Sequence, residues 1–125
     1  MGVGTEISTA EWQVMNVIWE RQPVTAREII AAVGPDNDWS PVTVRTFLHR
    51  LAKKGALKTE QDGNRYIYRA AVPRSKTIKQ ASNSFLASVF SGETAPLLTH
   101  FVKNSKLSPE QIEELRQLLD DKEAK

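Results

Sequence analysis

Apolar residues recur at the spacing of helices in three segments near the start of the chain. Each segment begins with a serine or threonine, the residue types that cap helix N-termini, and the first two carry a glutamate three positions later, as in a capping box. Proline or glycine follows each segment. The pattern predicts helices at residues 8–22, 25–33 and 40–54, with a polar loop at 36–38.

The spacing changes between residues 56 and 70, where two short strand-like segments flank Asp62-Gly63. This dipeptide is typical of a hairpin turn. Tyr66 and Tyr68 lie on one side of the second segment, and we expect them to pack against the sheet rather than stack on bases. Three helices followed by a hairpin is the element order of a winged helix.

Helical spacing returns after Pro73 and continues to the end of the chain. A thin helical arm cannot bury all of its apolar side chains, and each large one left in water forfeits about 1.5–3 kcal/mol. We expect two copies of the chain to bury them mutually as a homodimer; the alternative is that the arm folds back on the first domain. The predicted dimerisation residues are Phe85, Val89, Leu97, Leu98, Phe101, Val102, Ile112, Leu115 and Leu119.

The predicted fold class is therefore mostly α with a small β-hairpin. A winged helix-turn-helix domain is expected at residues 1–73 and a C-terminal helical dimerisation arm at residues 74–125.

Charge is distributed unevenly along the chain. The net charge is +2, yet residues 39–79 contain 10 Lys and Arg against 2 Asp and Glu, whereas both flanking segments are acidic. A local excess of this size is typical of a surface that binds a polyanion. A solvated basic surface would show the same excess, so charge alone leaves both interpretations open.

The third predicted helix separates into two faces at 100° per residue. Val44, Phe47, Leu48 and Leu51 share one arc. The opposite face combines cations with short hydroxyls, and no acidic residue occurs between Trp39 and Lys58. A solvated helix face usually mixes both signs of charge, because opposite charges at i,i+4 stabilise it. The observed face instead suits a groove walled by phosphates and lined with base edges.

The N-terminal part of a recognition helix meets the bases in helix-turn-helix docking. We therefore expect base contacts from Thr43, Arg45 and Thr46 and phosphate contacts further along the helix, although each threonine alone could be a surface residue. Ser40 can cap the helix and leave amides free near a phosphate. The predicted DNA-binding residues are Ser40, Val42, Thr43, Arg45, Thr46, His49, Arg50, Lys53, Lys54 and, on the hairpin, Arg65.

Composition argues against several other classes of protein. The chain has no cysteine, which excludes disulfides, Cys-ligated zinc and thiol catalysis, and its two histidines, His49 and His100, are far apart. We find no Gly-rich phosphate loop, nucleophile elbow or carboxylate–histidine cluster, so we expect neither an enzyme nor a metal or cofactor site. Without a membrane-length apolar run or signal peptide, we expect a cytoplasmic protein with no membrane insertion.

Two further alternatives remain from the residues alone. A winged helix can serve as a protein-interaction module, which would favour a mixed-charge third helix. A protein can also bind DNA without sequence preference.

Three segments of the chain, at residues 7–19, 39–55 and 107–115, resemble the penicillinase-repressor family, which includes the β-lactamase, methicillin-resistance and copper-transport repressors (BlaI/MecI/CopY). The resemblance implies a homodimeric transcriptional repressor that binds a palindromic operator in double-stranded DNA. It further implies an operon for resistance or metal homeostasis. Val42 stands where several members carry a basic residue.

The resemblance also bears on how the repressor is released. In resistance-type members a membrane sensor triggers proteolytic cleavage in the dimerisation arm, at an Asn-Phe step. The resemblance therefore implies a sensor-linked protease as a partner. The matching step here is His100-Phe101, which keeps the Phe but replaces the Asn, and this replacement argues against cleavage at the step. Copper-responsive members carry a C-terminal Cys-rich motif, which this chain lacks.

Overall fold

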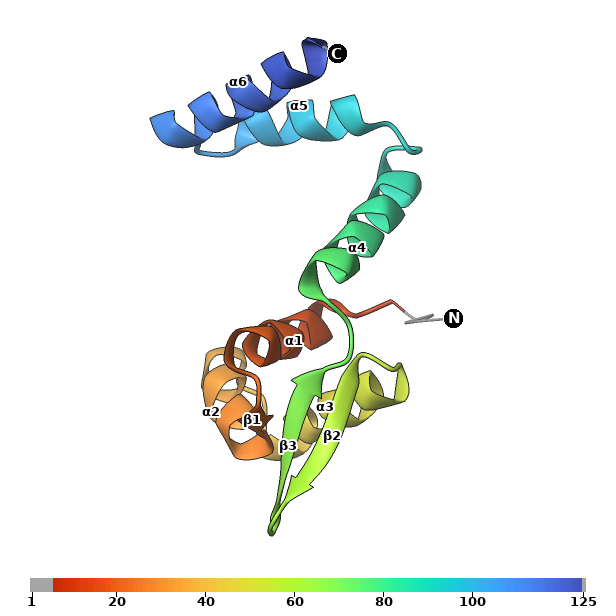
Figure 1. Cartoon of the computed structure of the whole chain (residues 1–125), viewed down its shortest axis with the longest axis vertical. Helices are drawn as coiled ribbons and strands as arrows, with labels where there is room; N and C mark the ends of the chain where they lie inside the picture. Colours follow the sequence, from red (N-terminus) through yellow and green to blue (C-terminus); the bar gives the residue numbers. More distant parts are fainter. Residues whose placement is uncertain (1–5, 125) are drawn as a thin grey trace. The chain divides into compact units, whose positions relative to one another are not determined.

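The computed structural model describes residues 6–124, which form six helices and a three-stranded sheet (Figure 1). In chain order the elements are α1 (Thr9–Arg21), β1 (Val24–Thr25), α2 (Ala26–Asn37), α3 (Pro41–Lys53), β2 (Leu57–Asp62), β3 (Arg65–Ala70), α4 (Arg74–Val89), α5 (Thr94–Asn104) and α6 (Pro109–Glu123). The chain divides into two compact units, one ending at Ala81 and the other beginning at Ser82. This division falls inside α4, eight residues after the boundary expected from the sequence.

Side-chain caps start α1 and α2 where the sequence predicts them. The Ser8 Oγ accepts a hydrogen bond from the Glu11 amide at 3.2 Å, while the Glu11 carboxylate accepts one from the Ser8 amide at 2.8 Å. Thr25 and Glu28 form the same reciprocal pair at the start of α2. Each pair satisfies two backbone amides that a helix start would otherwise leave unbonded.

The first unit is built on a core that α1, α2 and α3 share with the sheet (Figure 1). The Nε1 of Trp19 donates a hydrogen bond to the Val72 carbonyl at 3.0 Å, which ties the segment after β3 to α1. The core consists of Val14, Met15, Ile18, Val24, Ala26, Ile29, Val33, Val44, Leu48, Leu51, Ala56 and Leu57. The three helices and the hairpin confirm the winged-helix prediction.

The sheet contains one more strand than the predicted hairpin. Its order is β1-β3-β2, and both pairs are antiparallel. The two-residue strand β1 pairs with β3, which is therefore the central strand of the sheet. Asp62 pairs with Arg65, so the turn residues are Gly63 and Asn64, one position later than expected. Gly63 has a φ of 65°, a left-handed conformation that favours glycine. Figure 1 shows this turn projecting beyond the helices.

One smaller prediction is wrong and another is confirmed for only one of its two residues. The second helix does not end at Gly34-Pro35 but continues to Asn37, so most of the expected loop at 36–38 is helical. Gly34 serves close packing rather than a helix stop, because a Cβ there would lie 3.2 Å from the Trp39 carbonyl oxygen. Both tyrosines of β3 are expected from the sequence to pack. Tyr68 does pack against the core, whereas Tyr66 remains 54% exposed.

A buried ion pair joins the start of α1 to the end of α3. The carboxylate of Glu11 is almost fully buried, and its Oε1 accepts a hydrogen bond from the Nζ of Lys54. The same ammonium donates to the backbone carbonyl of Glu6 at 2.8 Å. Burial raises the pKa of Glu11, but the bonds from Lys54 and Ser8 and the charge of Lys54 outweigh it, so this pKa lies below its ordinary value.

The second unit has little core of its own. No residue of α5 or α6 is buried in the chain as the structure describes it. Large apolar side chains stand 38–61% exposed along the unit, and they are Phe85, Val89, Leu98, Phe101, Val102, Ile112, Leu115, Leu118 and Leu119. Of the predicted dimerisation residues, Leu97 alone is partly buried.

We predict that Glu11→Gln lowers the free energy of unfolding of the first unit by about 1–3 kcal/mol at neutral pH, because Lys54 loses its anionic partner. Urea unfolding followed by tryptophan fluorescence measures this unit alone, since the three tryptophans are Trp12, Trp19 and Trp39. Glu28→Gln is the matched control, because Glu28 closes the capping box of α2 at an exposed position. Equal losses in the two variants would contradict the role of burial.

The same carboxylate sets a pH dependence. A carboxyl group whose pKa is lower in the folded state stabilises the fold above its unfolded pKa, here near 4.5, and this contribution is lost as the pH falls through the folded value. We therefore expect the stability difference between the native protein and Glu11→Gln to shrink below about pH 4.5. A difference that stays constant down to pH 3, measured by the same urea titrations, would contradict the lowered pKa.

Candidate nucleic-acid interface

The two faces of α3 are separated as the sequence predicts. Val44, Leu48 and Leu51 are buried, and Phe47 packs against the core from a partly buried position. The exposed residues of the opposite face are Val42, Arg45, Thr46, His49, Arg50 and Lys53. The structure therefore brings six of the ten predicted DNA-binding residues together on one outward surface of a single helix, and we call this surface the α3 face.

Hydrogen bonds order the start of the α3 face. The Ser40 Oγ accepts from the Thr43 amide at 3.2 Å and lies 3.0 Å from the Thr43 Oγ1. One turn further, the Thr46 Oγ1 donates to the Val42 carbonyl at 3.0 Å. These contacts hold Thr43 and Thr46 in fixed orientations at the end of the helix where base contacts are expected.

An aromatic contact that we did not anticipate fixes the entry into α3. The rings of Trp39 and Phe47 meet edge to face, with centroids 5.0 Å apart. Trp39 immediately precedes the N-cap Ser40. The hydrophobic staple pairs the residue before an N-cap with the fourth residue of the helix, here Val44, so it indicates that Trp39 packs on α3 but does not identify Phe47 as its partner.

The charge of Arg45 on the α3 face acts on Tyr68 of the sheet. Burial raises the pKa of the Tyr68 hydroxyl, and the positive charge of Arg45 offsets part of this rise. Tyr68 is therefore neutral at physiological pH. Arg45 itself is exposed, so its charge remains available on the α3 face.

The hairpin of β2 and β3, which we call the wing, carries two exposed ion pairs. Arg65 contacts Asp62 at 3.2 Å on the hairpin turn, and Arg69 contacts Glu60 at 3.2 Å across the two strands. Pairs this exposed typically contribute about 0.2–1 kcal/mol. Arg65 can therefore leave the Asp62 carboxylate and bind a phosphate instead at a small cost in free energy.

Lys54 is a correction to the predicted site. Its side chain is only 18% exposed, and its ammonium binds the buried Glu11 carboxylate and the Glu6 carbonyl. Releasing it to a phosphate would leave a carboxylate buried without its partner, which is strongly unfavourable. Lys54 therefore serves the interior of the first unit, whereas its neighbour Lys53 is exposed on the α3 face.

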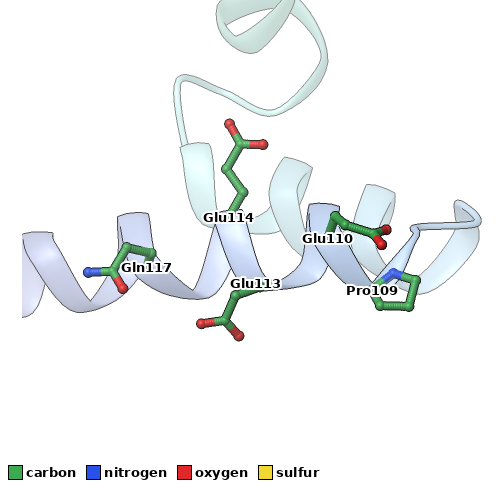
Figure 2. A pocket seen from close by; sticks show the side chains of 5 residues that line it. All are labelled: Pro109, Glu110, Glu113, Glu114 and Gln117. Carbon is green, nitrogen blue, oxygen red and sulfur yellow. The ribbon is translucent and has the colours of Figure 1, made fainter.

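The acidic residues of α6 do not form a second site. A shallow hollow is lined by Pro109, Glu110, Glu113, Glu114 and Gln117. Figure 2 shows Glu113 and Glu114 pointing to opposite sides of the helix, so their carboxylates do not converge. Across residues 6–124, no group of three or more His, Asp or Glu side chains is arranged to hold a metal ion.

The helices are too short or too polar for a bilayer. Within the part of the chain that the structure describes, none could cross a membrane.

Comparisons with known proteins agree with this geometry. The family model for the penicillinase repressor matches residues 7–121. The methicillin resistance regulatory protein MecI of Staphylococcus aureus (strain N315) is 39% identical over 117 residues, which cover 94% of this chain and 95% of that protein. The penicillinase repressor of Bacillus licheniformis is 37% identical over 116 residues, covering 93% and 91% of the two chains.

A solved structure extends the comparison to the fold. The monomeric form of Bacillus licheniformis BlaI, in complex with the blaP half-operator, superposes with a TM-score of 0.53 at 37% identity, covering 60% of this chain and 92% of that one. The sequence match spans nearly the whole chain, and the structural match covers a majority of it. The chain belongs to the penicillinase repressor family.

Proposed function

We propose that this protein is a homodimeric, sequence-specific transcriptional repressor that inserts α3 into the major groove of a palindromic operator. The observation that carries the proposal is the α3 face, on which cations and hydroxyls stand exposed while the opposite side of the helix is buried in the core. A basic surface without acidic residues is what a phosphate-walled groove requires. The related BlaI is described in complex with a half-operator, which supports this use of the fold.

The α3 face divides the contacts by position. Arg45 lies near the start of the helix and can bond the O6 and N7 atoms of a guanine together. Arg50 and Lys53 lie in the last turns, where cations meet the backbone phosphates of the groove wall. His49 is exposed between these two groups, and Arg65 supplies a further phosphate contact from the wing.

The proposed dimer explains the exposed apolar side chains of the second unit. Burying a large apolar side chain contributes about 1.5–3 kcal/mol, and α5 and α6 together expose seven of them at 38–61%. A second copy of the chain offers the same surface and therefore a self-complementary interface. Two winged units then read two half-sites, as the half-operator complex of the related monomeric BlaI suggests.

The names of the relatives suggest the regulated genes. Methicillin resistance and penicillinase regulators are among them, so we propose a resistance-type operon for this repressor as well.

We further propose release by a sensor-linked protease at His100-Phe101. Both side chains are exposed in the middle of α5, within reach of a protease. Asn104 donates to the His100 carbonyl at 2.8 Å, so a protease has to unwind this turn of the helix first. Cleavage here would separate α6 from the rest of the chain and remove part of the proposed dimer interface.

Separate substitutions of Arg45 and Arg50 distinguish the proposed base contact from the proposed phosphate contact. The probe is a duplex that the native protein enriches from a randomised library. We expect Arg45→Ala to weaken binding to it by roughly 1–3 kcal/mol and to leave binding to unrelated duplex nearly unchanged.

Arg50→Ala is the matched variant. We expect it to weaken binding to both duplexes and to reduce the slope of log affinity against log salt concentration by about 1. Fluorescence anisotropy across a salt series measures both effects. Identical behaviour of the two variants would contradict the assignment of base and phosphate contacts.

The dimer is tested by Phe101→Asp, which places a charge on the apolar face of α5. We expect a dimer for the native chain and a monomer for the variant, because burying a charge between the two copies is strongly unfavourable. Light scattering at micromolar concentration measures the mass. Thr99→Asp, at an exposed polar position of the same helix, is the control and should remain dimeric. A monomeric native chain would overturn this part of the proposal.

The cleavage step predicts a defined fragment. After induction, mass spectrometry of the repressor recovered from cells should show a fragment that ends at His100. Recovery of only the intact chain while the operon is expressed would contradict release by proteolysis.

A further inference from the structure

Val42 is the one strongly exposed apolar side chain of the α3 face. It is 73% exposed, a larger fraction than for any other large apolar side chain in the described residues. Single exposed apolar residues are common on protein surfaces, so this exposure gains meaning only from its surroundings. Val42 is the second residue of α3, at the end of the helix where base contacts are expected.

The fold gives no reason for a valine at this position. Val42 is absent from the core cluster and from the partly buried residues that pack against it. Valine is also a weaker helix former than alanine or lysine, because its branched Cβ loses rotamer freedom. A polar residue would therefore serve the stability of α3 at least as well.

The chemical character of the side chains on the α3 face changes in order along the helix from Val42 onward. Thr46 follows one turn later, and its Oγ1 donates to the Val42 carbonyl, which leaves its methyl group as the apolar part of an exposed side chain. His49, Arg50 and Lys53 continue the same stripe toward the C-terminal end. The stripe thus runs from apolar to cationic in the direction of the helix.

We propose that Val42, together with the Thr46 methyl group, packs on the C5-methyl group of a thymine in each operator half-site. This inference rests on the proposed function and specifies one base that the site selects. The major groove offers charged phosphates and polar base edges, and the thymine methyl is its apolar feature. The cationic end of the stripe meets the phosphate wall, which places the apolar end over the bases.

The experiment removes the methyl group from the DNA. The probe is the duplex enriched by the native protein, in which each thymine is replaced in turn by deoxyuracil in both half-sites. We expect one position at which the native protein loses about fourfold in affinity per half-site, the factor that corresponds to the burial of one methyl group. Other thymines should tolerate the replacement with smaller losses.

Val42→Ala identifies the protein partner of that methyl group. We expect the variant to lose the uracil penalty at this one position and to keep the native response at every other thymine. Thr46→Ser, which retains the hydroxyl and removes the methyl group, should reduce the penalty in part. Both substitutions lie at exposed positions, and unchanged urea unfolding by tryptophan fluorescence verifies that the fold is intact.

The outcomes separate this inference from the proposed function. An enriched duplex whose uracil penalties are the same for the native protein and for Val42→Ala would overturn the thymine contact and leave the repressor proposal standing. If no sequence is enriched from the library, sequence-specific binding itself fails, and the thymine contact falls with it.

Discussion

The winged unit depends on one buried carboxylate, that of Glu11. This group closes the capping box at the start of α1 through Ser8 and also binds Lys54 at the C-terminal end of α3. A buried charge without partners is strongly unfavourable, so both contacts must form together in the native state. A single side chain therefore couples the beginning of the first helix to the end of the recognition helix, 43 residues away.

This coupling determines which cations face outward. α3 is held at its start by the contact between Trp39 and Phe47, along its length by the core and at its end by Lys54. These three constraints fix the rotation of the helix about its axis and so hold the α3 face outward. A preorganised surface loses less conformational entropy on binding. Lys53 and Lys54 are adjacent in sequence, yet one belongs to the surface and the other to the interior.

The sequence predicts features whose causes are local. Capping boxes lie within four residues, and the division of α3 into two faces follows from helical periodicity, so both are found where expected. Features that depend on distant partners escape prediction. β1 is a strand only because β3 pairs with it, and the role of Lys54 depends on Glu11 in another helix. Gly34 resembles a helix stop until its close approach to Trp39 is known.

The two units differ in what holds them together, and this difference bears on regulation. The first unit has a core of twelve apolar residues, whereas α5 and α6 bury none of their own. Damage to the proposed dimer interface therefore need not unfold the winged unit. Two linked half-site readers bind far more tightly than either alone, because the second contact is made at a high effective concentration. In the proposed dimer, loss of the link would therefore weaken operator binding while each winged unit stays folded.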